Sequence, residues 1–330
     1  MAQLEARPLQ PTDVTRLIDH WQASPQWLPQ HPGLSGISSP GAPILGVFDG
    51  ERLVLTMIFR VRRRRFLTEW LTPAFMPFGG PVVSRDVHEL SPAKQESFWR
   101  DALGAVAGAI PPGVHRVDCA FSPEVMDGRG LAWAGWALRP QYTYLTRWAS
   151  EGTWADQFEN AVRRQAAKAE REGLAARILA PGEAGGLLKL WRKNAPRQGL
   201  DPGQGAELER LGRLMNEELG FVAEVGRENE PPQAAGLFAR DAHRCYYLAG
   251  ASDPEALGTG APTLLHFASL GEIDRRDWPR VYDWVGANTP AVAQFKKKFR
   301  PELAVQIGAR WESPRAGLAH LISGFRRGRN

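Results

Sequence analysis

The residues in this sequence that could do chemistry are mostly basic, and they occur in clusters. Of the 41 basic residues only seven are Lys, and all the others are Arg. Arg presents a planar fork of N–H donors that matches phosphate oxygens in a bidentate way, although a GC-rich coding sequence would produce the same bias. The clusters indicate a ligand that carries phosphate. They comprise Arg62–Arg65, Arg163–Arg164 with Lys168, Lys296–Lys298, and Arg326, Arg327 and Arg329.

A second phosphate-binding pattern is a pair of glycines before a predicted helix. Gly258 and Gly260 precede Pro262, which begins a helix expected over residues 262–275. Backbone N–H groups at a helix N-terminus can cradle a pyrophosphate. Glu255, however, places an acid three residues before Gly258, and two glycines are more often part of an ordinary loop. The pattern leaves pyrophosphate binding as one of two interpretations.

Composition excludes several other classes of protein. The 330 residues, 43% of them hydrophobic, can bury a full core and correspond to roughly two domains of about 150 residues each. Cys119 and Cys245 lack CxxC spacing, so we expect neither a disulfide framework nor a metal site. The longest apolar run, residues 102–114, is interrupted by Gly and Pro and is too short to span a bilayer. No signal peptide is recognised. We therefore expect a cytoplasmic monomer without a bound cofactor.

The hydrophobic periodicity predicts the same order of elements twice. Each half begins with a strand and one or two helices and continues with three successive strands, the first half with a hairpin at Asp49-Gly50. A helix, a strand, a second helix and a last strand follow. Three strands without intervening helices indicate a mixed sheet rather than a doubly wound one. This order resembles that of the acyl-transferring GNAT fold.

The predicted fold class is therefore α/β, of the α+β type with a mixed sheet, in two tandem GNAT-like domains. We place the first domain at residues 1–148 and the second at residues 149–308. An amphipathic helix is expected from Pro314, with apolar residues along one face. Because that face needs burial, residues 309–330 are expected to pack back on the first domain.

Four stretches together resemble the FemABX peptidyltransferases, which are tandem GNAT proteins. Asp283–Gly286 followed by Phe295–Phe299 is similar to the family's D-x-x-G … F-K-x-x-F-G signature. Tyr247–Ser252 matches Y-L-x-G-A-S, Arg163–Gly173 matches R-R-x-x-x-K-A-x-x-x-G, and Phe78–Pro81 is similar to P-R-G-P. The order and spacing of these stretches hold over nearly the whole chain.

The resemblance implies transfer of an acyl group from an activated donor to an amine. Known members move an amino acid from aminoacyl-tRNA to a cell-wall precursor peptide, and relatives with the same tandem fold use acyl-CoA. The amine attacks the ester or thioester carbonyl directly, so the protein orients the reactants and stabilises the oxyanion. We expect an aminoacyltransferase acting on an amine such as a peptidoglycan precursor. The alternatives are an acyl-CoA-dependent N-acyltransferase and a catalytically silent protein that binds RNA or a nucleotide sugar.

Two residues are the catalytic candidates that follow from the resemblance. Lys296 stands at the family's F-K position, where a cation would neutralise a donor phosphate or the developing oxyanion; the alternative is a solvated lysine on a helix face. Asp118 corresponds to the family's R-x-D-P, although Cys119 replaces the Pro. A carboxylate at a strand end could accept the proton of the attacking amine, and a structural carboxylate bonded to Arg116 fits equally well.

The remaining candidates would bind phosphate. Arg163, Arg164 and Lys168 would form a tRNA-tracking helix face, unless that face is merely solvated, and Lys297 would add general attraction. Arg197 resembles a family segment that contacts the nucleotide phosphates of the acceptor.

Two departures from the family pattern argue against a UDP-muropeptide acceptor. Gly79 replaces the Arg of P-R-G-P, and residues 27–39 lack the usual Lys.

Overall fold

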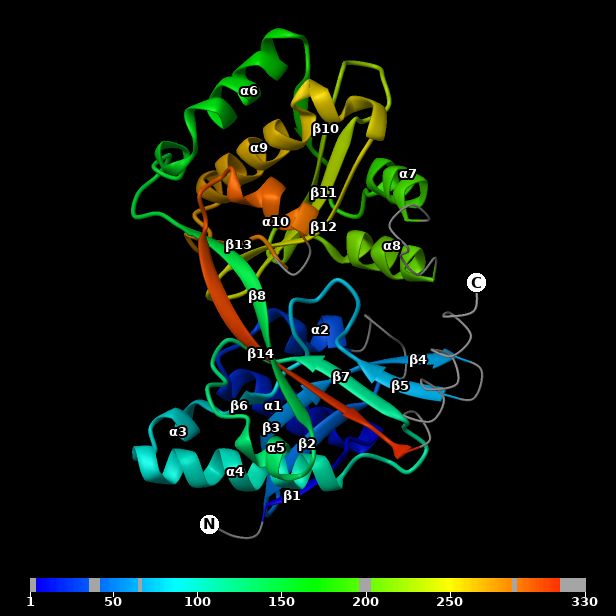
Figure 1. The fold of residues 1–330 in the computed structure, drawn as a ribbon, viewed down its shortest axis with the longest axis vertical. Coiled ribbons are helices and arrows are strands. Elements are labelled where there is room, and N and C mark those ends of the chain that lie inside the picture. Colours follow the sequence, from blue (N-terminus) through cyan, green and yellow to red (C-terminus); the bar gives the residue numbers. More distant parts are fainter. Residues whose placement is uncertain (1–3, 36–41, 65–66, 196–202, 287–289, 315–330) are drawn as a thin grey trace, which may run out of the picture. The chain divides into compact units, whose positions relative to one another are not determined.

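The chain folds into two compact units (Figure 1). The computed structural model describes residues 4–35, 42–64, 67–195, 203–286 and 290–314. Unit 1 runs to Gln141 and resumes at Gln306, and unit 2 comprises Tyr142–Val305. Both contain helices and β-strands, and the predicted α/β class with a mixed sheet is confirmed. The terminal helix predicted from Pro314 lies almost entirely outside the described residues.

Unit 1 contains a four-stranded antiparallel sheet and part of a ten-stranded mixed sheet. The first has the order β1 (Glu5–Pro8), β2 (Ile44–Asp49), β3 (Arg52–Ile58) and β6 (Val82–Val83). The second begins with the order β4 (Arg60–Arg64), β5 (Leu67–Leu71), β7 (Arg116–Ala120) and β14 (Glu302–Glu312). The helical elements are η1 (Pro11–Asp13), α1 (Val14–Ala23), η2 (Leu28–Gln30), α2 (Pro32–Ser35), α3 (Arg85–His88), α4 (Pro92–Gly108) and α5 (Arg129–Trp133).

Local sequence explains two features of unit 1. Gly50 has a φ of 60° in the turn between β2 and β3, a conformation that glycine adopts without strain, so the predicted hairpin is confirmed. Strand β3 ends at Ile58 and β4 begins at Arg60, because β3 belongs to one sheet and β4 to the other. Phe59 itself is fully buried in the core of unit 1.

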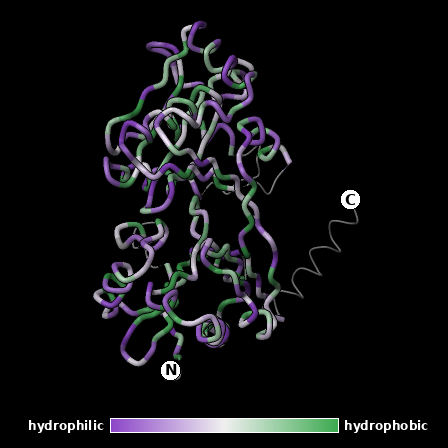
Figure 2. The backbone as a smooth tube through the Cα atoms, turned by 90° about the vertical axis from the view of Figure 1, so that its left-hand side faces the viewer, coloured by the Kyte–Doolittle hydropathy of each residue, from purple (hydrophilic) through white to green (hydrophobic). Residues whose placement is uncertain are grey.

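Unit 2 continues the mixed sheet with the order β8 (Ala137–Arg147), β13 (Val281–Asp283), β12 (Cys245–Ser252), β11 (Ala234–Arg240), β10 (Gly220–Gly226) and β9 (Ala175–Ile178). Strands β8 and β14 are neighbours, and each contributes residues to both units. The buried residues nevertheless form a separate core in each unit, and hydrophobic and hydrophilic segments alternate along the tube in both (Figure 2). The helical elements are η3 (Ala155–Gln157), α6 (Asn160–Arg171), α7 (Gly185–Asn194), α8 (Gln204–Leu214), η4 (Pro254–Thr259), α9 (Ala261–Arg275) and α10 (Pro290–Lys297).

The basic helix α6 begins and ends at residues with non-helical backbone. Phe158 has extended backbone angles and is buried in the core, so helix α6 begins only at Asn160. Gly173 follows α6 with a φ of 87°, the conformation that glycine commonly adopts after a helix. Among the described helices, none is long and apolar enough to cross a membrane.

A buried carboxylate holds the segment through which the chain enters unit 2. Asp274 of α9 accepts hydrogen bonds from the indole nitrogens of Trp148 and Trp154, at 2.7 and 2.8 Å, and from the backbone of Gly152 at 2.9 Å. Both indole rings are buried. Residues more than 100 positions apart are thereby fixed to one side chain.

We predict that Asp274→Ala lowers the free energy of unfolding by about 2–6 kcal/mol, because each buried donor left without a partner costs about 1–3 kcal/mol. Urea denaturation followed by tryptophan fluorescence measures this loss. The control is Asp277→Asn, since the Asp277 side chain is 94% exposed and Asn tolerates its positive φ of 50°. Equal losses in the two variants would contradict the anchoring role.

Candidate active site

The candidate active site lies where two parallel strands of unit 2 separate. Strands β12 and β13 pair only at Cys245 with Tyr282 and at Tyr246 with Asp283. Beyond these pairs β12 continues to Ser252, whereas β13 ends. The separation creates a fork, which we define as Tyr247 on one arm and residues 284–286 on the other.

Lys296 of helix α10 binds the second arm of the fork. Its Nζ donates hydrogen bonds to the carbonyl oxygens of Trp284, Val285 (2.7 Å) and Gly286 (2.9 Å). The residue is 5% exposed, and burial lowers the pKa of its amine to about 8, against the opposing effect of Asp283. Lys296 is therefore no solvated lysine: its ammonium group fixes the turn that follows β13.

The turn itself needs this support because two of its residues have positive φ. Val285 has a φ of 47° and Gly286 a φ of 80°, and a β-branched residue rarely adopts that region. On the strand side, the Asp283 carboxylate accepts from Thr143 Oγ1 at 2.5 Å and from the Val285 backbone at 2.9 Å. Burial raises the pKa of Asp283, and these two donors and Arg244 oppose the rise.

Tyr247 faces Lys296 from the first arm, and the sequence analysis assigned it no role. Lys296 Nζ lies 5.8 Å from the centre of its ring. The ring also makes an edge contact with His266, at 4.7 Å between centroids. Gly250 makes room for it, because a Cβ there would lie 1.5 Å from the Tyr247 hydroxyl. The Y-L-x-G pattern thus contained the signal: a tyrosine on the strand and a glycine beneath its hydroxyl.

The arrangement combines a buried, fixed cation with a half-buried phenol. Burial lowers the pKa of His266 to about 3, so its imidazole is neutral at pH 7, and its Nδ1 lies 2.9 Å from the Tyr282 hydroxyl. Burial raises the pKa of Tyr247, so its hydroxyl keeps its proton. A protonated phenol can donate a hydrogen bond or a proton to an oxygen that gains charge.

The glycine pair and the basic helix, which were separate predictions, lie next to each other. Gly260 has a φ of 83°, and a Cβ there would lie 3.0 Å from the carbonyl oxygen of Gln165 and 3.2 Å from Ala169, both in α6. Thr263 of α9 also donates to the Gln165 side chain at 3.0 Å. Gly258, by contrast, is exposed and has open space where its Cβ would be.

The basic residues that the sequence predicted to bind phosphate are exposed or half-exposed. Arg163 donates to Asn160 and lies 3.6 Å from Asp156, and Lys168 lies 3.4 Å from Glu172. Arg164 and, in helix α10, Lys297 are exposed. All four remain accessible to a charged ligand. Arg197 lies outside the described residues.

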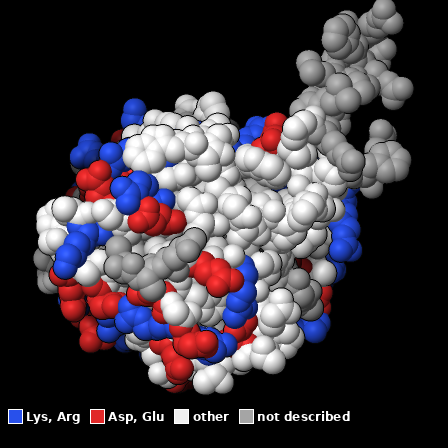
Figure 3. All heavy atoms as spheres, turned by 90° about the horizontal axis from the view of Figure 1, so that it is seen from below, with Lys and Arg blue, Asp and Glu red and all other residues white. Residues whose placement is uncertain are grey.

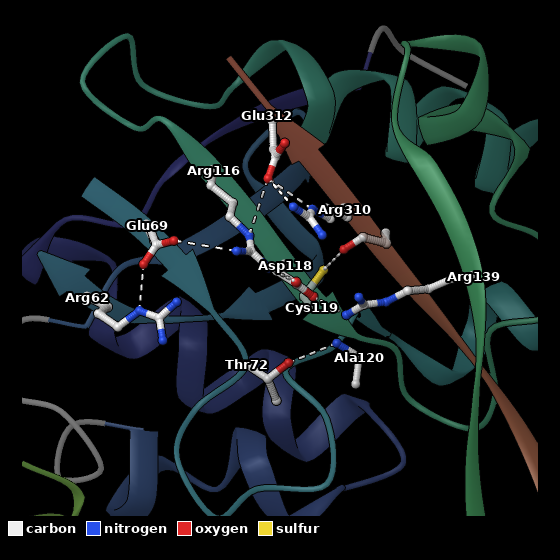
Figure 4. Close-up of polar contacts among 11 residues, drawn as sticks. Arg62, Glu69, Thr72, Arg116, Asp118, Cys119, Ala120, Arg139, Arg310 and Glu312 are labelled. Atoms are coloured by element: carbon white, nitrogen blue, oxygen red, sulfur yellow. Dashed lines mark hydrogen bonds and ion pairs between the residues drawn. The ribbon is translucent and has the colours of Figure 1, made fainter. Parts of the chain in front are cut away.

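Asp118 lies in unit 1, on β7, and its carboxylate is already bound by two arginines. One carboxylate oxygen accepts from Arg116 and the other from Arg139 (Figure 4). A proton from an amine would have to compete with both guanidinium groups. Cys119 points away and is buried, which raises the pKa of its thiol.

The equivalent fork in unit 1 is closed by backbone. Strands β5 and β7 pair in parallel as far as Leu71 with Asp118, and the Thr72 hydroxyl then accepts from the Ala120 backbone at 2.8 Å. Gly79 N–H donates to the Ala120 carbonyl at 3.0 Å. A Cβ at Gly79 would lie 2.4 Å from the Ile58 carbonyl, which explains why Arg is absent from this position. Of the two forks, that of unit 2 carries the side chains suited to acyl transfer.

In the part of the chain that the structure describes, no three His, Cys, Asp or Glu side chains are grouped so that they could hold a metal ion.

On the face drawn in Figure 3, acidic and basic residues are interspersed. The basic residues behind the net charge of +5 therefore do not gather into one continuous patch on that face.

Comparisons with known proteins show what the fold is similar to. A GNAT acetyltransferase domain matches residues 156–297. The fold is similar to that of FemX (12% identity, 96% of this chain and 99% of FemX covered, TM-score 0.57). It is also similar to L-PGS from Bacillus licheniformis (13%, 97% of each chain, 0.57) and to a tandem GNAT protein from the clavulanic acid biosynthesis pathway (12%, 94% and 98%, 0.55). No curated protein matches the chain in sequence.

We predict that Lys296→Met lowers the free energy of unfolding at pH 7 by about 1–3 kcal/mol, because the carbonyl oxygens that it binds lose a charged donor. Lys297→Met, one position along the same helix and exposed, should change it by less than about 0.5 kcal/mol. Thermal and urea denaturation of both variants measure the difference. Equal stability of the two variants would show that Lys296 does not hold the turn.

The lowered pKa of Lys296 predicts how the stability difference between the wild type and Lys296→Met depends on pH. The pKa of Lys296 is about 8 in the folded chain and about 10.5 in the unfolded chain, so between these values the unfolded chain binds more protons at this residue. Stability therefore rises with pH across that window. The stability advantage of the wild type over Lys296→Met should grow between pH 8 and pH 10.5, as measured by urea denaturation at each pH. A constant difference would contradict the lowered pKa.

Proposed function

We propose that this chain, which has a FemABX-like tandem GNAT fold and a region that matches a GNAT acetyltransferase domain, moves an aminoacyl group from aminoacyl-tRNA to an amine. The acceptor would be a peptide amine such as that of a peptidoglycan precursor. Unit 2 would bind the donor, with its ester at the fork and its phosphates along α6. This choice of donor rests on how the backbone N–H groups at the N-terminus of α9 are used.

The first turn of α9 is a poor cradle for the pyrophosphate of a coenzyme. The Ala261 N–H already donates to the Thr259 hydroxyl at 3.3 Å, and Pro262 has no N–H. Asp253 and Glu255 add negative charge just before the helix, and Asp253 caps η4 by accepting from the Glu255 backbone at 3.1 Å. A helix N-terminus binds phosphate through available N–H donors, so the basic side chains of α6 are the better phosphate ligands in this region.

The proposed reaction is direct attack of the amine on the ester carbonyl. The new C–N bond forms as the ester C–O bond breaks, and the 3′-terminal hydroxyl of tRNA leaves. Tyr247 would donate its proton to the leaving oxygen, and Lys296 would hold the turn and add positive charge near the oxyanion. The attacking nitrogen loses the proton that the leaving oxygen gains, and it passes through Tyr247, whose hydroxyl is thereby restored. Asp118, which is held in unit 1 by Arg116 and Arg139, is assigned no step in this reaction.

A second candidate is an acyl-CoA-dependent N-acyltransferase. One observation favours it: Gly258 is exposed with open space around its Cα, so a ligand's phosphates could approach the backbone of η4 there. In that case the basic residues of α6 would contribute little.

Two variants distinguish the donors. Arg164→Glu with Lys168→Glu should lower kcat/KM for aminoacyl-tRNA, with an effect that shrinks as salt is raised, because phosphate contacts are screened. Gly258→Val should leave that reaction unchanged. Because a Cβ at Gly258 would meet no atom within 4 Å, this variant should fold and serves as the matched control. Single-turnover assays with charged tRNA and with acyl-CoA measure both effects. Loss of acyl-CoA turnover in Gly258→Val, with the charge-reversal variant unaffected, would overturn the tRNA proposal.

A further inference from the structure

Unit 1 carries an apolar surface that stays largely uncovered in the described part of the chain. Met126 and Trp133 are 84% and 66% exposed, more than any other large apolar side chain described in unit 1. On the neighbouring helix α4, Gly104 and Gly108 are exposed, and a Cβ at either position would meet no atom within 4 Å. We call these four residues the α4–α5 patch.

Helix α5 packs against α4, which brings the parts of the patch together (Figure 1). Arg129 of α5 lies 2.9 Å from Glu96 of α4. The next residue, Gly130, fits so closely that a Cβ there would lie 2.5 Å from the carbonyl oxygen of Arg100. Because these contacts advance in the same direction along both helices, α5 leads toward the C-terminal half of α4, where the glycines of the patch lie. An exposed apolar area on one side of a helix pair is typical of an interaction site.

The described chain ends beside both helices. The N–H of Ser313 donates to the carbonyl oxygen of His115, at 2.8 Å, in the connection that follows α4. The rings of Trp311 and Trp136 are 6.4 Å apart, and Trp136 is three residues beyond Trp133 of α5. The segment 315–330 therefore begins within reach of the patch, since four residues can span about 13 Å.

We infer that residues 315–330 of the same chain cover the α4–α5 patch. Apolar residues recur in this segment at helical spacing, at Leu318, Leu321, Ile322 and Phe325. A helix rises about 10.5 Å from Leu318 to Phe325, as it does from Gly108 back to Asp101 of α4. Positions without a side chain leave room for the large side chains of a second helix. The apolar stripe thus matches the length of the exposed α4 face and fits above its two glycines.

The charges around the patch favour this occupant over a membrane or a nucleic acid. Arg129 is paired with Glu96 and Asp127, at 2.9 and 2.8 Å, and Arg100 with Asp101 at 2.7 Å. A border of paired charges offers no net attraction for an anionic lipid or phosphate. Covering the patch is also independent of which donor unit 2 uses. The arginines of the segment flank its apolar stripe and can stay in solvent; they are Arg315, Arg326, Arg327 and Arg329.

Disulfide cross-linking in the full chain tests this occupant. Gly104→Cys combined with Ile322→Cys should form a disulfide within one chain on oxidation, seen as faster migration on non-reducing gels. The native Cys119 and Cys245 are buried and should not interfere. The matched control is Gly271→Cys with Ile322→Cys, because Gly271 is also exposed on a helix, with open space around it, but lies in unit 2. The control should form no disulfide within the chain.

Thermal denaturation of full-chain variants gives a second readout. Trp133→Ser should lower the melting temperature, because the indole ring is covered when the segment is in place. Ile322→Asp should lower it as well. In the Ile322→Asp background Trp133→Ser should add nothing further, since the effects of residues in contact are not additive. An indole ring that stays in solvent would instead be replaced without loss in either background.

Three results would overturn the inference. Equal cross-linking through Gly104 and Gly271, or none through either, would show that the segment does not occupy the patch. A disulfide formed only between chains would identify a second copy as the occupant. Binding to phosphatidylglycerol vesicles that is lost in both Trp133→Ser and Ile322→Asp, without the disulfide within the chain, would identify a lipid surface.

Discussion

The ammonium group of Lys296, bound by three successive carbonyl oxygens, is the interaction on which the candidate active site depends. It holds a turn in which Val285 and Gly286 have positive φ, and that turn keeps the second arm of the fork away from β12. A buried cation is costly unless polar groups surround it, and here the backbone supplies them. The lowered pKa of Lys296 reflects that cost. The lysine therefore shapes the site as well as carrying charge into it.

The two units use the same topological feature in different ways. Both contain a pair of parallel strands that separate after two or three residue pairs. In unit 1 the gap is bridged by a hydrogen bond from the Ala120 N–H to the Thr72 hydroxyl and by one from the Gly79 N–H to the Ala120 carbonyl, whereas in unit 2 it is lined by Tyr247 and Lys296. The same topology therefore ends in main-chain and hydroxyl groups in unit 1 and in a phenol and an ammonium group in unit 2.

Charge is also organised differently in the two units. In unit 2 the basic residues of α6 are on a helix and pair with acids near them in sequence, as Lys168 does with Glu172. In unit 1 the arginines are on strands and pair with acids brought across the sheet, as Arg62 does with Glu69. Helical pairs of this kind contribute little to stability and are easily exchanged for a ligand. The cross-strand pairs are more buried and hold their guanidinium groups in fixed positions.

The sequence alone determined the order of the elements, because hydrophobic periodicity and turn residues such as Asp49-Gly50 are local signals. The resemblance to the FemABX family singled out Lys296, and the glycine pair was recognised from its place before a predicted helix. The sequence could not show that Lys296 binds the carbonyls of Trp284–Gly286, that Asp118 is held by Arg139, or that Gly260 touches α6. Each of these contacts joins segments ten or more residues apart, and Gly260 and Gln165 are separated by almost a hundred. Tertiary structure alone decided which charges are already paired, because pairing depends on strand register and helix packing rather than on spacing along the chain.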